Sequence, residues 1–117
     1  MHFKVYGIPN CDTVKKALLW LKVHGFQVDF LDYKKDGIST VKLKQWCGLA
    51  TWETIFNIHS STWKKLVTEG ASLPATQAQA IALMHRNSSI IKRPIIEVNG
   101  ELIVGFNENE YIEKIIN

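Results

Sequence analysis

Apolar and polar residues follow two different periods near the start of the chain. Phe3, Val5 and Tyr6 form a short β-prone run, and residues 7–10 (Gly-Ile-Pro-Asn) have the composition of a turn. Apolar residues then recur at the i, i+3, i+4, i+7 spacing of one helix face, at Val14, Ala17, Leu18 and Leu21. Alternation returns in residues 26–33 and predicts a second strand with one well-buried face. Strand, helix and strand together indicate a βαβ unit with parallel strands and a right-handed crossover.

The pattern changes after a predicted turn at residues 34–37, and short helical segments with polar breaks follow as far as about residue 86. Hydroxyl side chains can cap three of these helices: Ser39 or Thr40, Ser61 or Thr62, and Thr76. The first should end near Gly48, and a further short helix covers residues 51–56. The tryptophans of this block, Trp46, Trp52 and Trp63, are expected to fill the core of a small helical subdomain. The last helix is expected to turn Ala80, Ile81, Leu83 and Met84 inward, and the earlier helices also carry Val41, Leu43, Leu49, Leu66 and Val67.

The last quarter of the chain returns to β-prone sequence. Residues 95–98 and 101–104 are two apolar runs joined by Asn99-Gly100, which is the strongest short-range signal for a β-hairpin. A closing helix follows, and its apolar residues are expected to face inward: Tyr111, Ile112, Ile115 and Ile116. The order βαβ, helical block, ββα predicts an α/β protein with a mixed sheet, in a thioredoxin-like layout with a helical insertion between its two halves.

Cys11 falls directly after the first predicted strand and at the start of the first predicted helix. The partial positive charge and the unpaired N–H groups of a helix N-terminus stabilise a thiolate. Asn10 or Asp12 can cap this helix. Lys15, one turn along, would stabilise the thiolate if its side chain folds back, while the charge of Asp12 opposes it. A free cysteine is more often a small buried hydrophobe, but the strand–turn–cysteine–helix placement favours a reactive thiol with a lowered pKa.

Composition and charge exclude several classes of function. The chain has 14 basic and 11 acidic residues, and its net charge of +3 is too weak to predict binding to nucleic acid or to a membrane surface. No apolar run is long enough to span a bilayer, and the N-terminus lacks the apolar segment of a signal peptide. The histidines are scattered and have no metal-ligand spacing.

A length of 117 residues is sufficient for one domain with its own hydrophobic core. We expect the thioredoxin-like core to occupy residues 1–36 and 89–117 and the helical insertion to occupy residues 37–88. Cys11 and Cys47 do not make a disulfide framework, and a free thiol fits the reducing cytoplasm. We therefore expect a cytoplasmic monomer.

Four segments carry a resemblance to a known family: residues 6–17 (YGIPNCDTVKKA), 32–37 (DYKKDG), 61–63 (STW) and 91–97 (IKRPIIE). In this order they resemble the arsenate reductase (ArsC) family, and most closely its YffB/Spx-like branch. The resemblance implies that Cys11 is the nucleophile and that Thr13 and Lys15 complete a Cys-x-Thr-x-Lys anion loop. It also implies that Arg93 and a cis-Pro94 face the thiol.

The chain also differs from this family at positions that bear on function. Arsenate reductases of the family hold the oxyanion with three arginines, whereas only Arg93 matches here. His59 stands where the family often has an arginine, and the only other arginine is Arg86. Val14 occupies the second cysteine position of the Cys-x-x-Cys switch common in Spx, and Cys47 is interpreted as a core residue. The candidate substrate- or anion-binding residues are Asn10, Thr13, Lys15, His59, Arg93 and Pro94.

A single activated thiol needs an outside thiol to complete a catalytic cycle, and glutathione is the expected co-substrate. We therefore predict a glutathione-dependent thiol–disulfide reductase without a bound cofactor, whose substrate is a disulfide or an oxidised small molecule or protein. Two alternatives stay open. One is a non-catalytic transcriptional regulator that resembles Spx and binds RNA polymerase, and the other is an arsenate reductase with an incomplete set of arginines.

Overall fold

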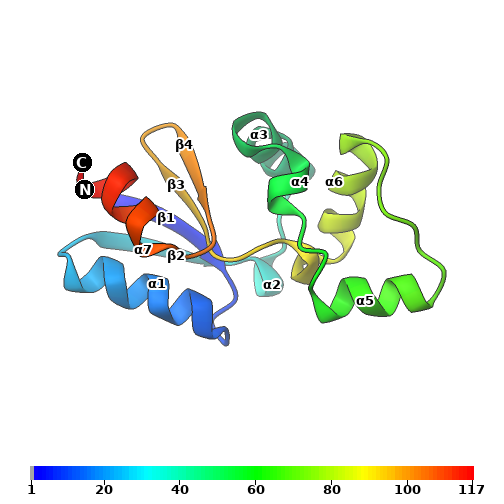
Figure 1. The fold of residues 1–117 in the computed structure, drawn as a ribbon, viewed down its shortest axis with the longest axis horizontal. Coiled ribbons are helices and arrows are strands. Elements are labelled where there is room, and N and C mark those ends of the chain that lie inside the picture. Colours follow the sequence, from blue (N-terminus) through cyan, green and yellow to red (C-terminus); the bar gives the residue numbers. More distant parts are fainter. Residues whose placement is uncertain (1) are drawn as a thin grey trace. The chain divides into compact units, whose positions relative to one another are not determined.

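The computed structural model describes residues 2–117 and divides the chain into two compact units (Figure 1). The first unit contains the segment up to Asp36 together with Arg93–Asn117, and the second contains Gly37–Lys92. The second boundary falls after residue 92 rather than after residue 88, because Ile91 still forms a β-bridge with Phe56 of the second unit.

The first unit is built on a four-stranded sheet with the strand order β2-β1-β3-β4. β1 and β2 are parallel, and β3 is antiparallel to both β1 and β4. The elements are β1 (His2–Gly7), α1 (Asp12–Val23), β2 (Gln27–Asp32), α2 (Tyr33–Asp36), β3 (Ile95–Val98), β4 (Glu101–Val104), α7 (Glu108–Tyr111) and the π-helical turn η2 (Ile112–Ile116). The predicted α/β fold with a mixed sheet in the thioredoxin-like order is therefore confirmed.

The hairpin of β3 and β4 has the predicted bounds. Asn99 and Gly100 connect the strands with φ values of 48° and 76°, the left-handed conformation that a type I′ turn requires at both central positions. Val98 pairs with Glu101 directly before the turn, which fixes the register of the hairpin. Because β3 also pairs with β1, the hairpin joins the C-terminal part of this unit to its N-terminal part.

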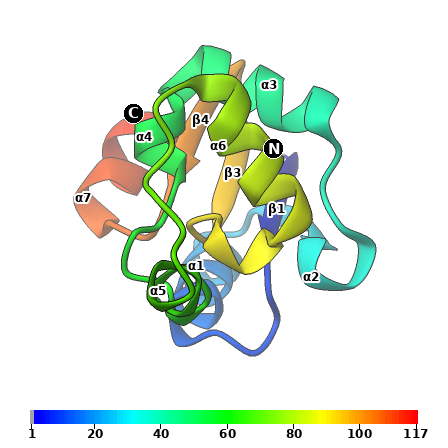
Figure 2. The same ribbon diagram turned by 90° about the vertical axis from the view of Figure 1, so that its right-hand side faces the viewer.

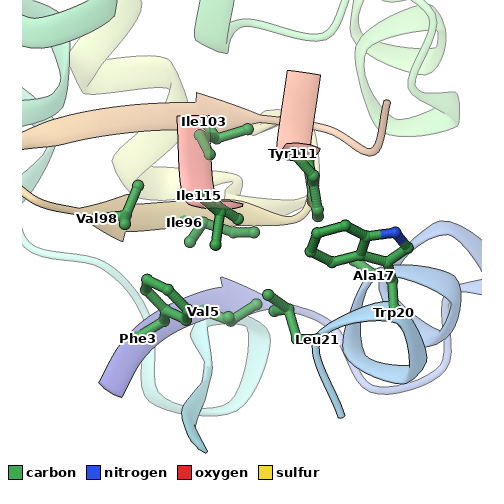
Figure 3. Packing of buried hydrophobic residues seen from close by; sticks show 10 residues of the cluster. All are labelled: Phe3, Val5, Ala17, Trp20, Leu21, Ile96, Val98, Ile103, Tyr111 and Ile115. Carbon is green, nitrogen blue, oxygen red and sulfur yellow. The ribbon is translucent and has the colours of Figure 1, made fainter. Parts of the chain in front are cut away.

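The main core of the first unit lies on one face of the sheet, against α1, α7 and η2 (Figure 3). Trp20 of α1 meets Tyr111 of α7 edge to face, with 5.3 Å between the ring centroids. The buried members of this cluster are Phe3, Val5, Ala17, Trp20, Leu21, Ile96, Val98, Ile103, Tyr111 and Ile115. This packing fixes α1 on the sheet and thereby fixes the place of the helix N-terminus, where Cys11 lies.

Two expectations for the first half of this unit need correction. β2 is an edge strand, so Val28 and Phe30 are half-buried and do not form the well-buried face that alternation predicted. The segment predicted as a turn at residues 34–37 lies largely in the short helix α2. Its first N–H groups donate to Asp32 Oδ1 at 3.0 and 3.1 Å, and this capping favours a helical turn over an open one.

The closing helix differs from the predicted amphipathic helix in its inward face. Ile112 and Ile116 are 38% and 48% exposed, although the sequence predicted them to face inward. The cause is the change from α-helical to π-helical hydrogen bonding after Tyr111, which alters the angular spacing of the side chains. Only Tyr111 and Ile115 of the predicted four are buried against the sheet.

The second unit is helical and contains α3 (Thr40–Ala50), α4 (Trp52–Ile55), α5 (Ser61–Thr68), α6 (Gln77–Arg86) and the 3-10 helix η1 (Ser88–Ile90). α6 packs along α3, and the loop of residues 69–76 carries the chain from α5 to the start of α6 (Figure 2). Trp46 and Trp63 are buried in this unit, as predicted, whereas Trp52 is half-buried.

Side-chain hydroxyls cap the helices of the second unit. Ser39 caps α3 and Thr76 caps α6, as predicted. The cap of α5 is Ser60, one residue before the predicted start, and its hydroxyl accepts from Trp63 N at 3.0 Å. α3 extends two residues beyond Gly48 and ends at Ala50.

Several apolar residues of the second unit are exposed. Val41, Leu49 and Val67 are 67%, 54% and 47% exposed. α3 buries only a narrow stripe, which consists of Leu43, Trp46 and Cys47. Val41 and Leu49 flank this stripe and therefore project away from it.

Candidate functional site

Cys11 lies between the carboxyl end of β1 and the first turn of α1. It is the N-cap residue of α1, with extended backbone angles (φ −142°, ψ 125°), and its carbonyl accepts the first helical hydrogen bond from Lys15 N at 3.0 Å. The end of β1 and the first turn of α1 approach each other closely at Gly7 and Val14. Glycine permits this approach, since a Cβ at position 7 would lie 3.0 Å from Val14 Cγ2. The side chain of Cys11 is partly exposed, so the sulfur is accessible to a substrate.

The electrostatic surroundings of Cys11 favour the thiolate. Burial alone would raise its pKa, but the backbone N–H of Val14, a hydrogen bond from the Arg93 side chain and the backbone N–H of Thr13 together lower it. The positive charge of Arg93 acts in the same direction. The Cys11 side chain makes no cap hydrogen bond. The N–H groups of Thr13 and Val14 are nevertheless the ones that point towards the side chain of an N-cap residue. The direction of this shift agrees with the lowered pKa that the sequence predicted for a thiol at the helix N-terminus.

Arg93 reaches the thiol from the segment that precedes β3. Because β3 runs antiparallel to β1, with Tyr6 opposite Ile95, the start of β3 lies beside the end of β1. The Arg93–Pro94 peptide bond is cis, as the resemblance implied, Pro94 is buried, and its carbonyl accepts from Gly105 N at 2.8 Å. The guanidinium is hydrogen-bonded to the Cys11 sulfur and to the Tyr33 side chain.

Tyr33 is a member of this site that the sequence reasoning missed. It directly follows β2, and the last residue of β2, Asp32, pairs with Gly7 at the end of β1. The residues that follow these two parallel strands therefore lie at the same edge of the sheet. Its ring is 1% exposed, and burial raises the pKa of its hydroxyl, so Tyr33 stays neutral beside Arg93. Two parallel strands that end together were the available signal, because the residues after such strands meet in space.

The structure places the other predicted residues of the first unit near the thiol in different ways. The side chains of Asn10, Thr13 and Lys15 are exposed, and Thr13 acts on Cys11 through its backbone N–H. Lys15 is exposed, and the predicted effect of its ammonium on the thiol stays a prediction.

His59 and Cys47 belong to the second unit. His59 is exposed, and its backbone N–H donates to Asn57 Oδ1 at 3.0 Å, so its predicted role beside the thiol stays a prediction. Cys47 is buried in α3, in agreement with its interpretation as a core residue. Burial raises the pKa of Cys47, and the charge of Glu53 raises it further, which makes this thiol a poor nucleophile.

The chemistry available at this site is that of one stabilised thiolate beside one fixed positive charge. Such a sulfur can act as a nucleophile towards a disulfide and as a leaving group afterwards. Across residues 2–117, no three His, Cys, Asp or Glu side chains are grouped so that they could hold a metal ion. In the same part of the chain, no helix has the length and apolar character needed to cross a membrane.

Comparisons with known proteins agree with this fold. The YFFB protein structure aligns with a TM-score of 0.87 and 40% identity, covering 97% of this chain and 98% of that one. The solution structure of an arsenate reductase (ArsC) related protein from Brucella melitensis aligns with a TM-score of 0.72 and 37% identity, covering 97% and 93%. The global transcriptional regulator Spx of Listeria innocua is 30% identical over 108 residues, covering 91% of this chain and 81% of that protein.

The match to a family model extends over nearly the whole chain. It covers residues 6–114 and therefore includes Cys11, Tyr33 and Arg93. The matched region also contains all four segments that carry the resemblance, which are residues 6–17, 32–37, 61–63 and 91–97. This chain belongs to the ArsC family.

Proposed function

We propose that this protein is a glutathione-dependent thiol–disulfide reductase in which Cys11 is the nucleophile. The observation that supports the proposal most directly is the partly exposed Cys11 sulfur, whose pKa is lowered despite burial by N–H groups of α1 and by Arg93. A lowered pKa increases the thiolate fraction at neutral pH, and the thiolate is the species that attacks disulfides.

The proposed cycle has two exchange steps. The Cys11 thiolate attacks the glutathione sulfur of a mixed disulfide between glutathione and a substrate, the disulfide bond breaks, and the substrate thiolate leaves and takes a proton from water. The thiolate of a second glutathione then attacks the glutathione sulfur on Cys11. This step releases oxidised glutathione and restores the Cys11 thiolate. One mixed disulfide and one glutathione give one substrate thiol and one oxidised glutathione.

Arg93 supports both steps, because the negative charge resides on the Cys11 sulfur before the first step and returns to it in the second. A guanidinium hydrogen bond to a thiolate is charge-assisted and is stronger than a neutral one. The exposed side chains of Asn10 and Lys15 beside Cys11 are proposed to contact anionic groups of the substrate.

The proposal that a second glutathione completes the cycle is based on the residue at the second position of a Cys-x-x-Cys pair. Val14 occupies the place where a Cys-x-x-Cys pair would have its second thiol, and it is fully buried. Glutathione in solution is therefore the proposed resolving thiol, and no bound cofactor is needed.

A second candidate function is regulatory binding to RNA polymerase, and the similarity to Spx of Listeria innocua favours it. The lowered pKa of Cys11 is compatible with a sensor thiol in such a regulator, so the two functions must be separated by turnover. Arsenate reduction has weaker support, because Arg93 is the one guanidinium that contacts Cys11 among the described residues of the first unit.

The deciding experiment measures reduction of a glutathionylated peptide, with oxidised glutathione recycled by glutathione reductase and NADPH. We expect turnover by the wild type, undiminished turnover by Cys47→Ala and loss of turnover in Cys11→Ser. If the wild type forms a glutathione adduct on Cys11 but does not turn over, the reductase proposal is wrong. Capture of purified RNA polymerase under those conditions would then support the regulatory function.

A further inference from the structure

The guanidinium of Arg93 is held from two sides. It is hydrogen-bonded to the Cys11 sulfur and to the side chain of Tyr33. These residues come from three separate segments, which follow β1, follow β2 and precede β3. An arginine side chain is long and has many rotamers, so a contact with the thiolate alone would leave the guanidinium free to swing into solvent.

Tyr33 is suited to prevent this movement because its own position is fixed. The ring is 1% exposed, and the residue begins α2, whose first turn is capped by Asp32 through N–H bonds at 3.0 and 3.1 Å. The phenol oxygen therefore presents its acceptor at a defined place beside the edge of the sheet where Cys11 lies.

The chemical nature of this partner also matters for the thiol. A carboxylate in the same place would pair with Arg93 and neutralise its charge, which would reduce the attraction between the guanidinium and the thiolate. Tyr33 remains a neutral phenol, so it orients the guanidinium and leaves its positive charge available to Cys11. The nearby carboxylate of Asp32 accepts the N–H groups of the α2 cap at its Oδ1.

We propose that Tyr33 is a positioning residue of the reductase site, which holds the Arg93 guanidinium against the Cys11 sulfur without neutralising it. This inference rests on the proposed function for its catalytic consequence. Its physical core, the dependence of the Cys11 thiolate on the Tyr33 hydroxyl, is independent of turnover and can be tested separately.

The test measures the rate of Cys11 alkylation by iodoacetamide as a function of pH, in a Cys47→Ala background so that one thiol reports. Tyr33→Phe removes the hydroxyl and keeps the ring. We expect the midpoint of the profile to move to higher pH in Tyr33→Phe, with the alkylation rate at pH 7 reduced a few-fold, as for loss of one hydrogen bond. Arg93→Met should move the midpoint further in the same direction.

Two further variants separate positioning from a general structural effect. Tyr111→Phe is the matched control, because Tyr111 is also buried in the first unit and its hydroxyl donates to Gly105 O at 2.7 Å. We expect it to leave the Cys11 midpoint unchanged. In the double variant Arg93→Met with Tyr33→Phe, the midpoint should equal that of Arg93→Met alone, because Tyr33 acts through Arg93.

The inference is overturned if folded Tyr33→Phe, checked by circular dichroism, keeps the wild-type midpoint. It is also overturned if Tyr33→Phe shifts the midpoint by the same amount with and without Arg93. A wild-type protein with a low midpoint but no glutathione turnover would refute the proposed function and would leave these two comparisons fully informative.

Discussion

The contact between Gly7 and Val14 connects the fold to the chemistry of Cys11, and Gly7→Ala tests that connection. A Cβ at position 7 would lie 3.0 Å from Val14 Cγ2 and 3.6 Å from both Val14 Cγ1 and Phe30 Cε1. Gly7 does not have a left-handed φ, so alanine is compatible with the backbone and the effect comes from crowding alone. Val14 is fully buried in the first turn of α1, so a shift of its side chain must displace core neighbours.

The expected magnitude is a difference between two effects. Overpacking a buried contact costs about 1–3 kcal/mol, while replacing glycine by alanine stabilises by about 0.4–1 kcal/mol through the unfolded chain. We therefore expect Gly7→Ala to lower the free energy of unfolding by about 0.5–2 kcal/mol in a urea titration. Displacing the first turn of α1 also moves the N–H groups of Thr13 and Val14 away from the sulfur, so the midpoint of Cys11 alkylation should rise.

Two variants make this prediction specific. Val14→Ala removes both γ carbons and should relieve the crowding, so the double variant should be more stable than the sum of the single effects by at least about 0.5 kcal/mol. Gly48→Ala is the control, since a Cβ there meets nothing within 4 Å, and it should stabilise α3 by about 0.5–1 kcal/mol. Wild-type stability and an unchanged alkylation midpoint in Gly7→Ala would refute the reasoning.

Three other outcomes follow from the same structure. Arg93→Met should raise the pKa of Cys11 and slow alkylation at pH 7, and a profile identical to that of the wild type would exclude a guanidinium effect on the thiolate. Because folding lowers the pKa of Cys11, its thiolate stabilises the folded state. This stabilisation is complete above the pKa of the unfolded chain and is lost as the pH falls through the folded-state pKa. Urea titrations from about pH 6 to pH 9 should therefore show that the free energy of unfolding rises with pH more in the wild type than in Cys11→Ser. Gly100→Ala should lower stability by about 1–2 kcal/mol, because φ at this turn position is 76°, and an unchanged melting temperature would contradict the type I′ turn.

Local chemistry was sufficient to predict the elements that short-range rules control. The Asn99-Gly100 turn and the Ser39 and Thr76 caps occur at the predicted residues, because a left-handed dipeptide and a hydroxyl cap act within a few residues of their own position. The exposed Val41 and the half-buried β2 depend on which neighbours cover them, and a single sequence does not specify those neighbours. Tertiary packing therefore determines which side chains of an element are buried, while local sequence determines where turns and helix caps form.

The candidate site divides in the same way. Cys11 was predictable because its strand, turn and helix are adjacent in the chain. The choice between Lys15 and Arg93 as the cation at the sulfur was less accessible, since Lys15 is near in sequence while Arg93 is brought to the thiol by the pairing of β3 with β1. Tyr33 was missed because its hydrogen bond to Arg93 joins distant parts of the chain, and the available signal, its place directly after a strand that ends beside β1, was not used.

The packing of Val14 also bears on how the thiol is regenerated. Its side chain is fully buried and approaches Gly7 rather than the sulfur, so this position serves the β1–α1 contact while its N–H serves the thiolate. One residue thus supplies packing through its side chain and charge stabilisation through its backbone. A cysteine at position 14 would provide a second thiol but would remove the apolar contact that valine makes with Gly7. An external resolving thiol requires no change at position 14, so Val14 keeps both its packing contact and its N–H group beside Cys11. The packing of Val14 therefore fits an external resolving thiol, which in the proposed function is glutathione.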